Sequence, residues 1–561
     1  MTDRISPALL SDAIVVSDPG KAVGIAARAE PLAQGSAPRT VTDQQAVQWA
    51  MSLQRDGQSK QAEVIYRQIL AQQPRQSDAL HLLGLMMFQR GRLDMAVDLV
   101  RRAIDARPNF ATYYSNLGVI LRARGEQDAA LKAYQAALRL AGDSAELHNN
   151  LAVMHDELGQ REIALQHAWL ALSLDPNDAP ARNNLANILR RQGRLFESVA
   201  QLQAALKIKS QYPDAWFNFG LTLEELGEFK QALQCYDNAI KLDDKHRNAL
   251  RYRALLQLKL GDFAAGWAGY ELRQRGFNAP PSSPPWQGQP IAGNTLLLLA
   301  EHGLGDAIMF SRYCLLAAKV SGARLIAQCD PSLRDLFGAI GSVSQWFDRR
   351  EIVPAHDFHL SLHSLPWLLK TTAQTIPAPY SYLRAPANRV QQLDLRIGAD
   401  LPAGRKVGIV WSGAPQAARA DSRSCPFSYF LQLLQVPDLQ LISLQSGEAA
   451  AHWLDAHAPA RMRAMNLRCR DHADLAMVIA QLDLVIAVDS SIAHLAGALG
   501  KPVYLLLTKL ADWRWQLERG DSPWYPSMRL LRQEHVGDWG GVFARLIDEL
   551  RQEGASAKSS A

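Results

Sequence analysis

A glycine recurs every 34 residues through the first half of the chain, and this period constrains the fold more than any other feature. Small residues follow five positions later in six of the units, and tyrosines share a further slot. A unit of this length with a turn glycine is typical of two antiparallel helices stacked on the next pair. The units are predicted to begin near residues 43, 77, 111, 145, 179 and 213, and a seventh, less regular pair is expected from about 247 to 275. The glycines are Gly57, Gly91, Gly125, Gly159, Gly193, Gly227 and Gly261.

This pattern resembles the tetratricopeptide repeat. The resemblance implies an all-α superhelix over residues 43–275 with a concave groove that binds a protein or peptide partner. One asparagine keeps the 34-residue period on the helices expected to line that groove, where side-chain amides can hold the backbone of an extended peptide. The alternative is that these asparagines only cap helices or pack between units. They are Asn116, Asn150, Asn184 and Asn218.

The segments outside the repeats and the bulk composition set further limits. Residues 1–42 are rich in Ala, Ser, Pro and Gly, so they are expected to be disordered, as is the tail 554–561. Residues 276–290 form a Pro/Ser-rich linker. No apolar run approaches the roughly 20 residues of a membrane span, and no dense Lys/Arg block points to nucleic acid. The five cysteines do not form a disulfide or metal pattern, which favours a cytoplasmic protein.

The second half changes to short apolar runs that alternate with amphipathic helices. Expected strands lie at 295–300, 324–329 and 358–362, and then at 406–413, 439–445, 484–489 and 502–507. This alternation predicts parallel sheets covered on both faces. We expect two α/β domains, at 291–390 and 403–553, with a ligand cleft beyond the carboxyl ends of their strands.

The first expected strand is followed by EHGLGDAIMFSRY at 301–313. Gly303 and Gly305 allow the backbone to turn and to approach a ligand closely. Asp306 is expected to begin a helix that runs to about Val320. Its carboxylate is either a helix N-cap or a general base that faces the cleft and takes a proton from a hydroxyl.

In the second domain, small residues at Ser412 and Gly413 leave room for a ligand after the strand at 406–413. Arg423 lies on the next loop, where a guanidinium can donate two hydrogen bonds to a phosphate, although most loop arginines are solvated. Gln445 and Glu448 follow the next strand and could hold sugar hydroxyls.

The stretch VDSSIAHLAGALGKP at 488–502 ends one strand and opens a helix. The free N–H groups and the dipole at such a helix start favour a phosphate. Asp489, Ser490, Ser491 and His494 therefore form a candidate diphosphate site. The alternative is an ordinary capped helix with a packed histidine.

Several segments, in chain order, resemble bacterial proteins in which tetratricopeptide repeats are fused to a heptosyltransferase-like domain of glycosyltransferase family 9. They are EHGLGDAIMFSRY, KVGIVWSG, SRSCPFSYF, LISLQSGE, DLVIAVDSSIAHLAGALGKPVYLLL and DWRWQLERGDSPWYPSMRLLRQ. Residues 489–495 match the family pattern D-[ST]-x-x-x-H-L, and GLGD is similar to its N-terminal G-D motif. The stretch 512–526 looks characteristic of the repeat-fused branch.

The resemblance implies a GT-B fold and inverting sugar transfer without a metal or other cofactor. It makes Asp306 the general base, and it places Arg423, Asp489, Ser490, Ser491 and His494 at the diphosphate of a nucleotide-sugar. The predicted function is that of a cytoplasmic glycosyltransferase whose repeats recruit a protein or peptide acceptor. The alternative is a repeat scaffold whose transferase-like domain binds without turnover, because the loop AARADSRS lacks the His and Asn of that branch.

Overall fold

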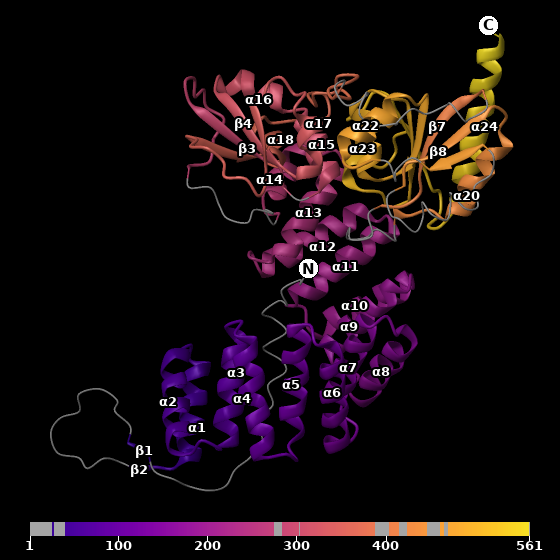
Figure 1. Ribbon diagram of the computed structural model, residues 1–561. Helices are drawn as coiled ribbons and strands as arrows, with labels where there is room; N and C mark the ends of the chain where they lie inside the picture. Colours follow the sequence, from indigo (N-terminus) through magenta and orange to yellow (C-terminus); the bar gives the residue numbers. More distant parts are fainter. Residues whose placement is uncertain are drawn as a thin grey trace. The chain divides into compact units, whose positions relative to one another are not determined.

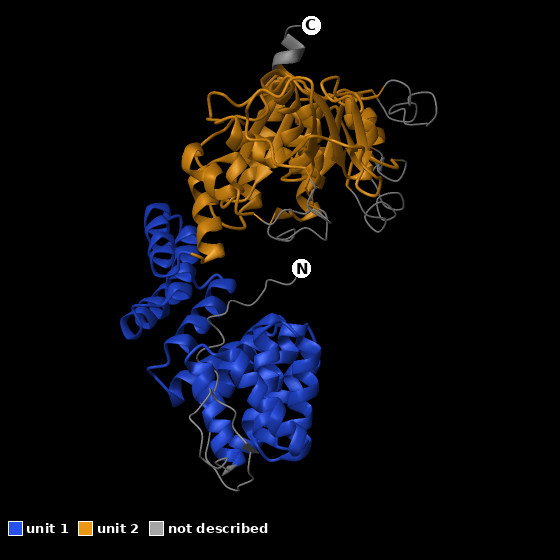
Figure 2. Cartoon of the chain, turned by 90° about the vertical axis from the view of Figure 1, so that its left-hand side faces the viewer, with its two compact units in different colours: residues 1–244 blue, residues 245–561 orange. Residues whose placement is uncertain are grey.

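The computed structural model describes residues 25–26, 40–273, 283–301, 303–386, 403–413, 423–445, 461–464 and 469–559 (Figure 1). Their contacts divide the chain into two compact units, residues 1–244 and 245–561 (Figure 2).

The first unit is an array of helix pairs whose first helices begin where the 34-residue period predicts, at Asp43, Ser77, Ala111, Ala145, Ala179 and Pro213. The helices are α1 (Asp43–Arg55), α2 (Ser59–Gln72), α3 (Ser77–Gln89), α4 (Leu93–Ala106), α5 (Ala111–Arg124), α6 (Gln127–Ala141), α7 (Ala145–Glu157), α8 (Arg161–Leu174), α9 (Ala179–Arg191), α10 (Leu195–Ile208), α11 (Pro213–Leu226) and α12 (Phe229–Leu242).

The periodic glycines turn the chain between the two helices of each pair. All seven have a positive φ, between 73° and 86°, which side-chain-bearing residues rarely adopt. The periodic tyrosines also explain why the first helix of two pairs carries a glycine, at Gly118 and Gly220, where a tyrosine ring leaves no room for a side chain. A Cβ on Gly118 would lie 2.6 Å from the ring of Tyr134, and one on Gly220 would lie 2.5 Å from Tyr236. Both rings are fully buried, so these pairs of helices close on an aromatic side chain.

The segments predicted to lack structure are described only in part. Within residues 1–42, β1 (Ile25–Ala26) and β2 (Thr40–Val41) pair antiparallel, and Thr42 caps α1. Within the linker 276–290, Trp286 is buried, and its ring N–H donates to the Gln289 carbonyl at 2.7 Å. The prediction of a disordered tail at 554–561 is wrong for residues 554–559, because α24 (Trp539–Ser559) continues through them. The remaining residues of 1–42, the start of the linker and residues 560–561 lie outside the described residues.

The second unit contains two parallel sheets, in agreement with the predicted α/β pair of GT-B type. The first has the order β5-β4-β3-β6, with β3 (Thr295–Leu299), β4 (Arg324–Cys329), β5 (Gln345–Asp348) and β6 (Phe358–Ser361). The second has the order β12-β11-β10-β7-β8-β9, with β7 (Arg405–Val410), β8 (Leu439–Ser443), β9 (Met462–Ala464), β10 (Leu484–Val488), β11 (Val503–Leu507) and β12 (Met528–Arg532).

Helices connect these strands and carry the motifs. They are α15 (Leu304–Ser311), α16 (Cys314–Ser321), α17 (Arg334–Phe337), α18 (Leu365–Leu368), α20 (Phe427–Leu431), α22 (His472–Ala480), α23 (Ser491–Ala498) and α24 (Trp539–Ser559). The predicted single helix from Asp306 to Val320 is wrong, because the chain breaks at Arg312 and Tyr313. Arg312 is buried there and donates to the carbonyls of Pro377 and Trp524, and those distant partners hold the break.

The seventh helix pair, α13 (Arg247–Lys259) and α14 (Phe263–Tyr270), lies in the second unit, although its period groups it with the repeats. Trp267 on α14 is 1% exposed. Its ring lies 5.3 Å from that of Trp513 and 6.4 Å from that of Phe310, and its N–H donates to the Thr371 carbonyl at 3.0 Å. The last helix pair thus shares its core with the α/β sheets.

Candidate active site

The two motif helices, α15 from the first sheet and α23 from the second, lie against each other at their N-terminal ends. A Cβ on Gly305 would lie 2.9 Å from Cδ2 of His494 and 3.5 Å from Cα of Ser491. Only a glycine permits this approach without displacing its neighbours. The GLGD and DSSIAH motifs, nearly 200 positions apart in the sequence, therefore meet in one place.

Asp306 stands in the first turn of α15 and does not begin the helix. Gly303 occupies the N-cap with a φ of 114°, and the helix starts at Leu304. The N-cap interpretation of Asp306 is therefore wrong. Its side chain is 29% exposed, and it contacts groups from both halves of the unit. Gly303 lies close by, since a Cβ there would be 3.4 Å from Oδ2 of Asp306.

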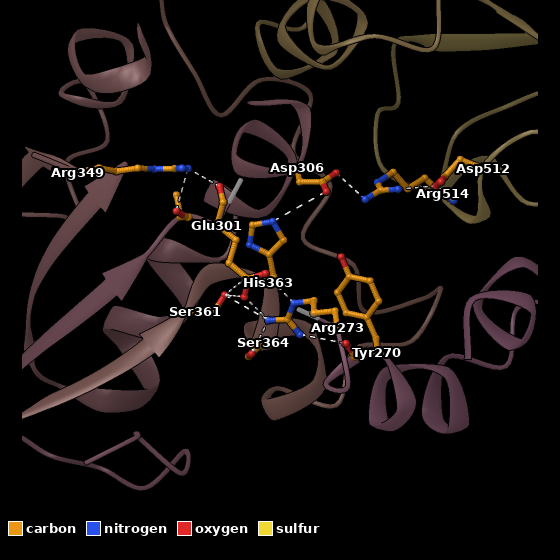
Figure 3. A network of polar contacts seen from close by, with 11 residues as sticks. Tyr270, Arg273, Glu301, Asp306, Arg349, Ser361, His363, Ser364, Asp512 and Arg514 are labelled. Carbon is orange, nitrogen blue, oxygen red and sulfur yellow. Dashed lines mark hydrogen bonds and ion pairs between the residues drawn. The ribbon is translucent and has the colours of Figure 1, made fainter. Parts of the chain in front are cut away.

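Arg514 forms the strongest contact of Asp306. It lies in a short 3₁₀ segment, Trp513–Trp515, between β11 and β12. One guanidinium nitrogen donates to Oδ1 of Asp306 at 2.5 Å, and another donates to Oδ1 of Asp512 at the same distance (Figure 3). The guanidinium also lies 4.5 Å from the ring centroid of Trp513. Because the buried Arg514 guanidinium binds two carboxylates at once, it fixes the positions of both.

The burial of this cluster and its charges change the pKa values of Asp306 and Asp512. Burial raises the pKa of Asp306, the Asp512 and Asp489 carboxylates add to the rise, and Arg514 opposes it. Burial also works against ionisation of Asp512, but Arg514 outweighs it and lowers the pKa of that carboxyl. A raised pKa makes Asp306 a stronger proton acceptor than an exposed aspartate.

The start of α23 combines a helix cap with buried polar side chains. The Ser490 hydroxyl accepts from the Ala493 backbone N–H at 3.4 Å, so the capping interpretation holds for that serine. Asp489 is 7% exposed and accepts from Arg423 at 3.3 Å. Arg423 is thus paired with the residue that directly precedes the N-cap of α23. Ser491 is the first residue of the helix and faces the α15 contact described above.

His494 is a packed histidine within this helix. Its Nδ1 lies 2.8 Å from the Tyr525 hydroxyl, and its ring stacks on Trp515 with centroids 5.2 Å apart. Burial lowers the pKa of His494 well below its ordinary value, and Arg514 and Arg312 add to the effect. The imidazole is therefore neutral, so it can offer a hydrogen bond to a ligand but no charge.

The residues after β7 and β8 contact each other. Both backbone N–H groups of Trp411 and Ser412 donate to Oε1 of Gln445, at 3.1 and 2.9 Å, and its Nε2 donates to the Ser412 carbonyl. Gln445 thus shapes the loop after β7 with the same atoms that were predicted to hold a sugar. Among the described residues, a Cβ on Gly413 would meet no atom within 4 Å. Glu448 lies outside the described residues.

Three of the four groove asparagines bind a polar side chain of the preceding repeat unit. Asn184 donates to Asn149 at 3.0 Å, and Asn218 donates to Asn183 at 2.8 Å, each bond joining consecutive units. Asn116 lies 2.8 Å from Nε2 of His81. These contacts favour packing between units for three of the four positions. Among the described residues, Nδ2 of Asn150 is buried without a hydrogen-bond partner.

Sequence reasoning missed Arg514, Asp512 and His363. The stretch 512–526 stood out as characteristic of the repeat-fused branch, but no residue in it was selected. An arginine between two tryptophans was the available signal, since that setting favours a buried, stacked guanidinium.

Two features are absent from the part of the chain that the structure describes. No group of three metal-ligating side chains is placed to hold a metal ion. No helix there combines the length and the apolar character that crossing a bilayer requires.

Family models match both halves of the chain. Tetratricopeptide repeat models match residues 47–111, 167–200 and 213–246, and a further TPR repeat model matches 120–159 and 186–227. The model of glycosyltransferase family 9 (heptosyltransferase) matches residues 448–533. The chain therefore carries tetratricopeptide repeats in its N-terminal half and a glycosyltransferase family 9 domain in its C-terminal half, as its motifs led us to expect.

Among curated proteins, the chain is similar to protein FlbA of Caulobacter vibrioides, with 26% identity over 372 residues. The match covers 59% of this chain and spans 60% of the length of that relative. Among solved structures, a thermophilic TPR protein of Thermus thermophilus, TTC0263, has 23% identity and a TM-score of 0.29, with 32% of this chain and 99% of that chain covered. The APC/C hetero-tetramer Cut9–Hcn1 has 17% identity and a TM-score of 0.37, with 40% and 44% covered.

Proposed function

We propose that this chain, with its tetratricopeptide repeats and its glycosyltransferase family 9 domain, transfers a sugar from a nucleotide-sugar to an acceptor hydroxyl. The observation that carries the proposal is the contact of Gly305 with His494. It sets Asp306, a carboxylate of raised pKa, beside the helix start where the diphosphate would bind. A base for the acceptor and a site for the leaving group are the two requirements of such a transfer.

The donor diphosphate is proposed to lie at the N-terminus of α23. Ser490 and Ser491 bring hydroxyls to that end, and Arg423 already lies against Asp489 with a contact of 3.3 Å. Negative charge grows on the diphosphate as the sugar leaves, so a helix dipole and a guanidinium stabilise the transition state more than the ground state. These groups would supply that charge without a metal ion.

The acceptor hydroxyl is proposed to lie near Oδ2 of Asp306, the oxygen that Arg514 leaves unoccupied. Asp306 takes the hydroxyl proton while the acceptor oxygen attacks the anomeric carbon from the face opposite the diphosphate. The bond from that carbon to the phosphate oxygen breaks, and its electron pair leaves with the nucleotide. This single displacement inverts the anomeric configuration.

The repeats are proposed to recruit the acceptor as a protein or peptide. Repeat arrays of this type bind partners along an extended surface, and the matches to tetratricopeptide models cover most of residues 47–246. Asn150 is the groove asparagine whose amide is left without a partner among the described residues, so it is the first position to test for peptide binding.

A thermal-shift screen against UDP-, GDP-, ADP- and CMP-sugars tests the donor site. A ligand present at a free concentration of 100 times its Kd stabilises the folded protein by about 2.7 kcal/mol and so raises Tm. We expect one nucleotide class to raise Tm in the wild type and in Asp306→Asn, but not in Ser491→Asp, which adds a negative charge at the start of α23. Ser173→Asp, on α8 of the repeats, adds the same charge elsewhere and should keep the shift. Transfer from the donor so identified should then fail in Asp306→Asn.

A non-catalytic scaffold is the alternative, and the internal ion pairs favour it. Asp306 is paired with Arg514 and Asp489 with Arg423, so the candidate base and the aspartate of the candidate diphosphate site are already neutralised within the chain. A nucleotide-dependent Tm shift without transfer to any acceptor would support a domain that binds without turnover. The absence of any shift would support a purely structural one.

A further inference from the structure

His363 lies behind the candidate base and has no hydrogen-bond partner for its ring among the described residues. It belongs to the 3₁₀ segment Leu362–Ser364 that directly follows β6, and it is 2% exposed. Its Nε2 is 4.0 Å from Oδ2 of Asp306 (Figure 3). Within the part of the chain that the structure describes, neither Nδ1 nor Nε2 has a partner, although both are buried. A buried polar group usually has one, so this ring calls for an explanation.

The segment that carries His363 is held by the residues just after the seventh helix pair. Arg273 donates to both carboxylate oxygens of Glu301, at 3.0 and 2.7 Å, and also to the Ser364 hydroxyl at 2.8 Å. The Ser361 hydroxyl donates to Glu301 at 2.6 Å and accepts from the His363 backbone N–H at 3.1 Å. This network holds the chain on both sides of His363 (Figure 3).

The charged groups around His363 keep its imidazole neutral. Burial lowers its pKa well below the ordinary value, and three cations add to the effect: Arg273 after α14, Arg514 from the loop after β11, and Arg349 after β5. The facing acids are Asp306 and Glu301, of which Glu301 is paired with Arg273. The ring of Phe310 covers one side at 5.0 Å between centroids.

The two oxygens of Asp306 are not equivalent. Oδ1 is bound to Arg514 at 2.5 Å, while Oδ2 faces His363. The proton taken from an acceptor therefore falls on Oδ2. A protonated carboxyl group has one O–H, which needs an acceptor when it is held away from water. A neutral imidazole has one nitrogen with a lone pair, and His363 places Nε2 on that side.

We propose that His363 is a positioning residue of the transfer: its Nε2 is unprotonated and accepts the hydrogen bond from Oδ2–H once Asp306 has taken the proton of the acceptor. This inference rests on the proposed function. In the step, the acceptor O–H bond breaks as the Oδ2–H bond forms, the acceptor oxygen binds the anomeric carbon, and the diphosphate leaves with the electron pair of its C–O bond. The proton stays on Asp306, and His363 stays neutral with its own proton on Nδ1.

The gain is in the strength of the base. A hydrogen bond accepted from the neutral carboxyl stabilises the protonated form of Asp306 and so raises its proton affinity. The distance of 4.0 Å between Nε2 and Oδ2 is longer than a hydrogen bond, and catalytic contacts commonly shorten when substrate binds.

Selective ¹⁵N labelling of the histidines of the full chain tests the inference without any substrate. Nitrogens that carry a lone pair resonate far from those that carry hydrogen, so the tautomer is read directly. We expect the signal removed by His363→Gln to show an unprotonated Nε2. We also expect it to shift with pH as Asp306 titrates, and to lose that shift in Asp306→Asn. His356, in the same half of the unit, is the internal control and should be unchanged by Asp306→Asn.

A signal that shows hydrogen on Nε2 would overturn the proposal, because His363 would then donate to the carboxylate and weaken the base. A His363 signal that is unaffected by Asp306→Asn would overturn it too. Both outcomes are independent of transfer activity. Failure of every nucleotide-sugar to bind or react would instead overturn the proposed function.

The second arm uses the donor identified by the screen. We expect His363→Phe to lower kcat about tenfold, as loss of one hydrogen bond to the base predicts, and to move the acid midpoint of the pH profile to lower pH. His363→Gln, whose side-chain carbonyl can accept the same bond, should recover part of both. A residue with only a structural role would change stability or KM, and it would leave the midpoint in place. An unchanged midpoint in a folded His363→Phe protein would therefore contradict the proposal.

Discussion

Gly305 and His494 touch across the two sheets of the second unit, and a Cβ on the glycine would lie 2.9 Å from the imidazole ring. The contact is too close for any side chain, and the His494 ring is held in place by Tyr525 and Trp515. The approach of α15 to α23 thus depends on one missing methyl group.

Gly305→Ala is expected to push these helices apart. The added methyl group overpacks a buried site, and the free energy of unfolding of the second unit should fall by about 2 kcal/mol. Chemical denaturation followed by tryptophan fluorescence measures this change. Gly341→Ala is the control, because a Cβ at Gly341 would meet none of the described atoms within 4 Å. Equal stability of the two variants would show that the close contact does not limit the packing of α15 on α23.

Arg514→Gln is expected to leave two carboxylates facing each other. Arg514 lowers the pKa of both Asp306 and Asp512, so its loss raises both pKa values in the folded state. A carboxyl whose pKa is raised in the folded state lowers the free energy of unfolding at high pH, where the group ionises. This loss of stability disappears at low pH, because the group is then protonated in both the folded and the unfolded chain. The variant should therefore lose more stability at about pH 8 than at about pH 5, on the order of 3 kcal/mol at the higher pH.

Arg519→Gln is the matched control for Arg514→Gln. Arg519 pairs in the same loop with Asp521, which is 71% exposed, so the loss of Arg519 should cost about 0.5 kcal/mol or less. Denaturant titrations of both variants at the two pH values make the comparison. A loss for Arg514→Gln that does not depend on pH would contradict the proposed electrostatic origin.

Trp267→Ala is expected to detach the seventh helix pair from the sheets. The ring packs against Trp513, Trp524 and Phe310 and is 1% exposed, so truncation leaves a large cavity. We expect a loss of about 4 kcal/mol in the unfolding of the second unit. Trp367→Ala removes a ring that is 43% exposed and should cost about 1 kcal/mol or less. Similar melting temperatures for the two variants would mean that α14 contributes little to the core of this unit.

The repeat unit is expected to lose stability in mild acid through His81. Burial lowers the pKa of His81 to about 4, and the ring binds Asn116. At pH values between the ordinary pKa of histidine and about 4, His81 is protonated in the unfolded chain but not in the folded one. The free energy of unfolding therefore falls as the pH decreases through this range. The full shift corresponds to about 3 kcal/mol.

Thermal melts of the full chain between about pH 7 and pH 4 test this dependence. His81→Gln keeps a partner for Asn116 but does not titrate, so the transition of the repeat unit should depend less steeply on pH. Some dependence should remain, because burial also lowers the pKa of His167 to about 4. An unchanged slope in His81→Gln would exclude His81 as a source of the acid sensitivity.

The sequence by itself determined the local features of both units. The helix starts at Asp43, Ser77 and Ala111 follow from the glycine period, since a turn that needs a positive φ is a property of the turn itself. The strands followed from apolar runs in the same way, and the two motif helices followed from residues adjacent in the chain. The short strands β5, β9 and β12 were missed because their apolar runs are brief and carry charged residues.

Only the tertiary structure decided which groups meet. Asp306 and Arg514 are 208 positions apart, and the bond between them exists because two parallel sheets bring their carboxyl ends together. Tertiary packing also places His363 next to Oδ2 of Asp306 and lets Gln445 bind the backbone of Ser412. It brings the seventh helix pair into contact with the α/β part of the unit. Periodicity reports the face on which a residue lies, but the choice of partner depends on packing between elements that are remote in the chain, and no local pattern records it.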